Sequence, residues 1–84
     1  MDVKEAVRDC IVEELDFSGP RAQLTDDYKL LDNQVIDSLG IFKIVSYLED
    51  RFNIEIDDDD LLPDNFETID SIAALVASKV GDGG

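Results

Sequence analysis

Two serines in this chain have neighbours that could support chemistry at a hydroxyl group. Ser38 lies in the run Ile36-Asp37-Ser38-Leu39-Gly40, and the same pattern of isoleucine, aspartate, serine, aliphatic and small residue recurs around Ser71. A serine that opens a helix can bear a phosphate ester, because free backbone N–H groups and the helix dipole favour negative charge there. An Asp-Ser pair before an apolar residue is also ordinary helix capping. The pattern therefore indicates two candidates and does not choose between them.

The segments around the two serines differ. Ser38 follows a long loop over residues 16–37 that contains several apolar side chains, and it opens a predicted helix. Ser71 lies just inside another predicted helix, with no comparable loop before it. Long loops in small domains are often functional. We therefore interpret Ser38 as the reactive residue and Ser71 as part of a helix start.

Apolar residues recur at spacings of three and four along much of the chain, which predicts amphipathic helices. The first helix is expected over residues 2–15, where Asp2 could cap the start. The second is expected over residues 38–52, with Asp37 or Ser38 as its cap. The apolar stripe of this second helix consists of Ile41, Ile44, Val45, Leu48 and Phe52.

Two further helices are expected toward the C-terminus. The acidic run Asp57 to Asp60 suits the first turn of a short helix around residues 58–62. The last helix is expected over residues 69–80, with Thr68 as its candidate cap. We predict an all-α fold, a small four-helix bundle with three main helices, one short helix and a long first loop.

Size and charge narrow the class of function. The 84 residues suffice for one small domain, expected over residues 1–80 with 81–84 as a flexible tail, and leave little room for an enclosed active site. Seven Lys+Arg against 21 Asp+Glu give a net charge of −14. Such a surface should repel nucleic acid and anionic membranes and favour basic partners. No apolar run approaches the ~20 residues of a membrane span, so a cytoplasmic location is expected.

The residue inventory excludes several kinds of catalytic site. The chain has no histidine, and Cys10 is its single cysteine, so Ser-His-Asp catalysis, Cys-His catalysis and an internal disulfide are excluded. Cys10 lies on the apolar face of the first helix, where we expect an inert core thiol. The run Asp57 to Asp60 lacks the alternating acidic spacing, the glycine and the later glutamate of a calcium loop. No metal is expected.

The whole chain resembles the acyl and peptidyl carrier protein family. The likeness covers the first amphipathic helix, the long loop, the Val35-Ile36-Asp37-Ser38-Leu39 junction and the run from Leu48 to Ile56. The resemblance implies a four-helix, non-catalytic carrier with 4′-phosphopantetheine esterified to Ser38. It also implies a phosphopantetheinyl transferase that installs this arm from coenzyme A, usually with magnesium, and that docks with the help of Asp37 and Leu39. The thiol of the arm would hold acyl or aminoacyl cargo as a thioester.

The resemblance also suggests a branch of the family. Fatty-acid carriers usually have an acidic residue where this chain has Gly40, and a more acidic second helix. The run Leu62-Pro63-Asp64-Asn65-Phe66 is similar to free-standing carriers of polyketide or nonribosomal peptide pathways, whereas the junction also resembles D-alanyl carriers. We expect a monomeric carrier of the polyketide or nonribosomal type, with fatty-acid and D-alanyl carriers as alternatives.

Its expected partners are the transferase, a loading enzyme, and condensing or tailoring enzymes. Candidate partner-recognition residues are Ile41, Phe42, Glu49 and Asp50, although Ile41 and Phe42 could equally belong to the core.

Two rival classes explain part of the sequence. Gly83-Gly84 is typical of sulfur carriers and ubiquitin-like modifiers, but those proteins need several strands, and the periodicity here is helical. An acidic helical interaction domain without a cofactor would explain the charge. It would leave the long loop before Ser38 without a role.

Overall fold

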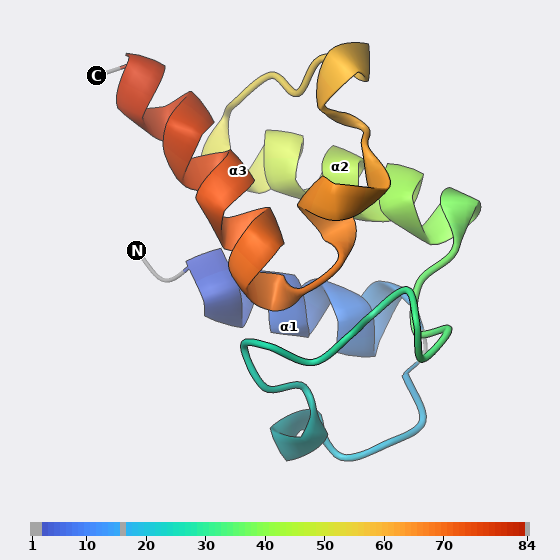
Figure 1. Cartoon of the computed structure of the whole chain (residues 1–84). Helices are drawn as coiled ribbons and strands as arrows, with labels where there is room; N and C mark the ends of the chain where they lie inside the picture. Colours follow the sequence, from blue (N-terminus) through green and yellow to red (C-terminus); the bar gives the residue numbers. More distant parts are fainter. Residues whose placement is uncertain (1–2, 16, 84) are drawn as a thin grey trace.

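Three α-helices form the frame of the molecule (Figure 1). The computed structural model describes residues 3–15 and 17–83. Within these residues there is no strand, which confirms the all-α prediction and argues against a strand-rich sulfur carrier or ubiquitin-like modifier. The helices are α1 (Val3–Glu14), α2 (Ser38–Phe52) and α3 (Ile69–Gly83), and the 3-10 turns are η1 (Arg21–Gln23), η2 (Asp58–Asp60) and η3 (Pro63–Phe66).

Two of the three helices differ from their predicted ranges at the ends. α2 has the predicted bounds, residues 38–52. α1 begins at Val3, and Asp2, the predicted cap, lies outside the described residues. α3 continues to Gly83 instead of ending at residue 80. That residues 81–84 form a flexible tail stays a prediction.

The expected short helix around residues 58–62 is instead divided into two turns. η2 is closed by a capping box in which the Asp57 side chain accepts from the Asp60 backbone and the Asp60 side chain accepts from the Asp57 N–H. The backbone then becomes extended at Leu62, with φ −95° and ψ 142°. Pro63 follows, and a residue before proline is sterically kept out of the α region. The proline therefore ends one turn and opens the next.

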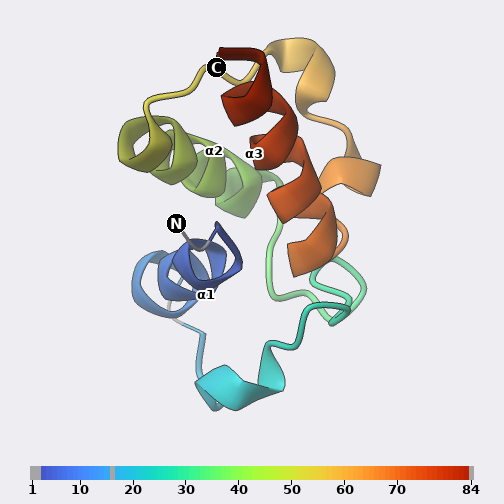
Figure 2. The same ribbon diagram turned by 90° about the vertical axis from the view of Figure 1, so that its left-hand side faces the viewer.

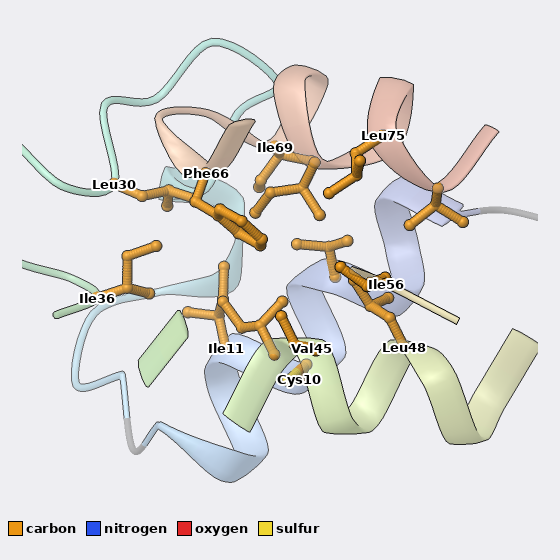
Figure 3. Packing of buried hydrophobic residues seen from close by; sticks show 14 of the residues in the cluster. Cys10, Ile11, Leu30, Ile36, Val45, Leu48, Ile56, Phe66, Ile69 and Leu75 are labelled. Carbon is orange, nitrogen blue, oxygen red and sulfur yellow. The ribbon is translucent and has the colours of Figure 1, made fainter. Parts of the chain in front are cut away.

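One hydrophobic core joins the three helices, the long loop and η3. α1 packs against both α2 and α3, and the Phe66 ring of η3 lies among Ile11, Leu30 and Ile69 (Figure 3). Cys10 is fully buried, which confirms its predicted place in the core, and this burial raises the pKa of its thiol to about 12 and so disfavours the reactive thiolate. The fully buried large side chains are those of Val7, Ile11, Leu24, Leu30, Ile44, Leu48, Phe66, Ile69, Ile72 and Val76.

The long loop that precedes α2 is fixed to the start of α3. The Leu30 N–H donates to the Glu67 carbonyl at 2.8 Å, and the Asp70 N–H donates to the Asp26 carbonyl at 3.0 Å. Leu24 and Leu30 are buried in the core. Figure 2 shows this part of the loop, in cyan and green, returning past the first turn of α3. The loop thereby holds the start of α2 at a defined place.

Ion pairs reinforce the same connection. The Asp26 carboxylate accepts from Lys4 of α1 at 3.0 Å and from Arg8 of the same helix. The Lys4 ammonium is also 3.0 Å from the Asp70 carboxylate of α3. These contacts, with the Lys4 hydrogen bond as the largest cause, hold the pKa of Asp26 below its ordinary value. Next to the Leu30–Glu67 hydrogen bond, Lys29 of the loop also pairs with the Glu67 carboxylate at 2.7 Å.

Candidate functional site

Ser38 is the first residue of α2, and Asp37 is the cap. The Asp37 backbone is extended, and its side chain accepts the Gly40 N–H at 2.8 Å. Of the two predicted caps, the structure therefore selects Asp37. The Ser38 side chain is exposed, and within the described residues no hydrogen bond engages its hydroxyl. The hydroxyl lies at the positive end of a 15-residue helix.

Ser71 has the opposite environment. Its N–H donates to the Thr68 hydroxyl at 3.1 Å, and its own hydroxyl is 3.0 Å from the same Thr68 oxygen. Thr68 is buried, and the prediction that it caps the last helix is confirmed. The two serines thus have similar sequence neighbours but different contacts. The Ser71 hydroxyl contacts Thr68, whereas no hydrogen bond engages the Ser38 hydroxyl within the described residues.

A shallow cleft of about 250 Å³ lies beside Ser38. One wall comes from Ile41 and Phe42 of α2. The other comes from Leu61, which follows η2, and from Pro63, the first residue of η3. The sequence was informative about the α2 wall, but it did not predict that residues 61–63 approach Ser38. That approach depends on tertiary packing, for which the local sequence has no signal.

The junction also exposes apolar side chains. Among the described residues, only four large apolar side chains are exposed, and three of them are Leu39 (72%), Phe42 (58%) and Leu62 (55%). Leu39 and Phe42 are three residues apart on α2 and therefore lie on one face. Leu62 lies between the two residues of the opposite cleft wall. The surface around Ser38 can bind an apolar partner surface.

The four candidate partner-recognition residues occupy different environments. Ile41 is half-buried against the core, whereas Phe42 is mostly exposed. The Glu49 carboxylate accepts the Ile56 N–H at 2.9 Å, so it orders the chain that follows α2. Asp50 is exposed. Glu49 and Asp50 lie about 17 Å along the helix axis from Ser38, given the rise of ~1.5 Å per residue.

Gly40 leaves little room for a larger residue at its position. A Cβ atom added there would be 3.3 Å from the Ile36 Cβ and 3.4 Å from the Asp37 Oδ1. A carboxylate side chain at position 40 would therefore crowd the junction and place a second negative charge near Asp37. In the sequence, Gly40 is only a departure from the acidic residue that is usual in fatty-acid carriers. The close packing gives a physical reason for a glycine at this position.

We also searched the described residues for metal sites and for membrane-spanning helices. Within residues 3–15 and 17–83, no group of three or more cysteine or acidic side chains is arranged to hold a metal ion. No helix in this part of the chain is long and apolar enough to cross a lipid bilayer. An accessible hydroxyl at a helix start, with first-turn N–H groups that have no intrahelical partner, fits a covalently attached phosphate group.

Comparisons with known proteins agree with this geometry. A family profile described as "Phosphopantetheine attachment site" matches residues 5–76. The acyl carrier protein of Streptococcus thermophilus is 33% identical over 94% of this chain and 97% of its own length. That of Campylobacter hominis is 38% identical over 69% and 71% of the two chains, and that of Thermotoga maritima is 29% identical over 95% and 94%. No solved structure gives a significant match.

Proposed function

This chain belongs to the carrier-protein family defined by the phosphopantetheine attachment site, and we propose that Ser38 is the residue to which its 4′-phosphopantetheine arm is attached. The contrast between the two serines supports this choice: the Ser71 hydroxyl contacts Thr68, whereas the Ser38 hydroxyl is exposed and free within the described residues. When bound, the arm supplies a thiol that holds acyl cargo as a thioester. The protein itself performs no catalysis and presents the loaded arm to its partners.

The residues around Ser38 have separate roles in this proposal. Asp37 fixes the first turn of α2 through its bond to the Gly40 N–H. The remaining first-turn N–H groups favour the negative charge of a phosphodiester on Ser38. Leu39 is largely exposed and offers the transferase an apolar contact next to the hydroxyl. The family's partners are phosphopantetheinyl transferases and enzymes that handle acyl groups.

Intact-mass measurement tests the attachment site. The protein is incubated with coenzyme A, magnesium and a broad-specificity phosphopantetheinyl transferase. We expect one mass increase equal to a phosphopantetheinyl group, absent from Ser38→Ala and present in the matched control Ser71→Ala. An adduct that persists in Ser38→Ala and is lost in Ser71→Ala would move the site to Ser71. No adduct on the wild type with several transferases would contradict the attachment.

We further infer that the carrier serves polyketide or nonribosomal peptide synthesis. The close packing at Gly40 supports this branch, because a Cβ atom there would lie 3.3 Å from the Ile36 Cβ, and a larger residue would require its neighbours to shift by a few tenths of an ångström. The neutral charge balance of α2, which contains Lys43, Glu49, Asp50 and Arg51, supports it as well. Fatty-acid and D-alanyl carriers are the alternatives, and the relatives named acyl carrier protein favour the former.

Loading assays distinguish these branches. The arm-bearing protein is offered to a malonyl transferase of fatty acid synthesis, to an adenylation enzyme of nonribosomal synthesis, to a loading acyltransferase of polyketide synthesis and to a D-alanine ligase. We expect a lower kcat/KM with the fatty-acid and D-alanine enzymes than with one of the specialised enzymes. Efficient malonyl loading by the fatty-acid enzyme alone would assign the chain to that branch instead.

A further inference from the structure

The negative charge of this protein is unevenly distributed around Ser38. α2 contains two cations, Lys43 and Arg51, and two carboxylates, Glu49 and Asp50, so its formal charge is zero in a chain of net charge −14. The next segment, residues 53–68, contains seven carboxylates and no cation. These are Glu55, Asp57, Asp58, Asp59, Asp60, Asp64 and Glu67.

The cations of α2 are also more available than the others. The other five lysine and arginine side chains all form ion pairs, namely Lys4, Arg8, Arg21, Lys29 and Lys79. Within the described residues, Lys43 forms no ion pair. Arg51 contacts the Tyr47 ring, with its guanidinium carbon 6.0 Å from the ring centroid. A basic partner surface placed on α2 would therefore meet an uncompensated ammonium group at Lys43.

The acidic segment forms the other wall of the Ser38 cleft. It leaves the end of α2, passes through η2, and returns toward the start of α2 before η3, as its yellow and orange trace in Figure 1 shows. Leu61 and Pro63 line the cleft. Two of the seven carboxylates, Asp57 and Asp60, face Lys79, at 3.8 and 2.6 Å.

Three other carboxylates of this segment are exposed on either side of residues 61–63. Asp58 and Asp59 precede these residues and Asp64 follows them, and we call the three the acidic border. No ion pair engages them within the described residues. The border is therefore open to a basic surface that covers the cleft.

We propose that the phosphopantetheinyl transferase docks on this carrier with apolar side chains over the cleft and basic side chains against the acidic border, and not against α2. The inference rests on the proposed attachment at Ser38. An enzyme that reaches the Ser38 hydroxyl must cover both apolar cleft walls, of which one belongs to the neutral helix α2 and the other is flanked by the acidic border. Complementary charge on a rim speeds association and fixes orientation. The border thus determines which way round the transferase binds.

Paired charge-removal variants test this orientation. Asp59→Asn/Asp64→Asn removes one charge on each side of residues 61–63. The matched control, Glu13→Gln/Asp27→Asn, removes two exposed charges from α1 and the long loop. The readout is kcat/KM for modification of the unmodified protein by the transferase with coenzyme A at low salt. We expect a fall of about fivefold for the border variant, a fall that shrinks as salt increases, and no comparable fall for the control.

Three outcomes would overturn the inference. These are an unchanged kcat/KM in the border variant, an equal fall in the control, and a larger fall in Asp50→Asn, which removes a charge from α2. Circular dichroism of each variant verifies that it is folded. These failures differ from failure of the proposed function. If the wild type is not modified at Ser38, the attachment site is wrong, whereas modification at Ser38 with equal rates in all variants contradicts only the docking orientation.

Discussion

Ser38 and Ser71 have similar neighbours in the sequence, and single residues around them account for their different environments. The free hydroxyl of Ser38 follows from Asp37, which caps α2 through the Gly40 N–H and leaves the serine without a local bond. At the second site the cap is two residues earlier in the pattern, at Thr68. Thr68 was predictable as a cap, and Ser71 is then the third residue after it, so the sequence did contain a signal for the engaged serine. The crowding around Gly40 had no such signal, because it depends on where Ile36 packs.

The cap at Asp37 predicts a stability effect that is separate from any docking role. Asp37→Ala should lower the free energy of unfolding by about 1 kcal/mol, because the Gly40 N–H loses its acceptor. Asp37→Ser keeps an acceptor while removing the charge, so its stability should stay near that of the wild type. Urea denaturation measures both, with Asp32→Ala as an exposed control from the loop. Equal losses in the alanine and serine variants would show that charge, and not capping, stabilises the helix start.

Among the elements, the regular helices were predictable and the irregular segments were not. α2 has the predicted bounds because a clear apolar stripe lies between Asp37 and Asn53, whose positive φ of 53° ends the helix. The segment after it was predicted as one short helix, although Pro63 could have indicated the break. What the sequence does not show is that Phe66 must reach the centre of the core, which places residues 61–63 beside Ser38.

The attachment of the long loop predicts a dependence of stability on pH. The folded-state pKa of Asp26 lies below its ordinary value of 3.8, mainly because of Lys4. Its stabilising contribution is therefore complete above that pH and is lost as the pH falls through the folded-state pKa. Asp26→Asn should lower the melting temperature at neutral pH, and the gap to the wild type should shrink in acid below pH 3.8.

Melting curves across this pH range measure the effect of Asp26. Asp27→Asn removes the same formal charge one residue away and controls for the general relief of repulsion. Within residues 3–15 and 17–83, the one hydrogen bond to the Asp27 side chain is local and comes from the Thr25 hydroxyl. A gap between Asp26→Asn and the wild type that stays constant from neutral pH to strong acid would show that the carboxylate does not hold the loop.

The molecule as a whole contains three times as many acidic as basic residues, 21 against 7. Composition was sufficient to predict repulsion within the folded chain. It could not predict that the helix beginning at Ser38 is neutral while the segment opposite it is acidic, because that contrast depends on which segments meet in space.

The charge excess predicts that salt stabilises this fold. Raising the ionic strength from about 0.01 M to about 0.15 M shortens the Debye length from about 30 Å to about 8 Å, which weakens repulsion across the molecule. The exposed ion pairs are weakened too, but such pairs typically contribute little. The melting temperature should therefore rise with sodium chloride at neutral pH. A flat or falling melting temperature would mean that the ion pairs outweigh the net repulsion.

The acidic border has a second consequence, which concerns encounters between identical molecules. An apolar opening flanked by Leu39, Phe42 and Leu62 would ordinarily make a small protein adhere to its own copies. Here, two copies that met face to face would bring the three carboxylates of one acidic border against those of the other. The border therefore protects the opening from self-association while leaving it accessible to a basic enzyme. Solubility and selectivity would then have the same electrostatic origin.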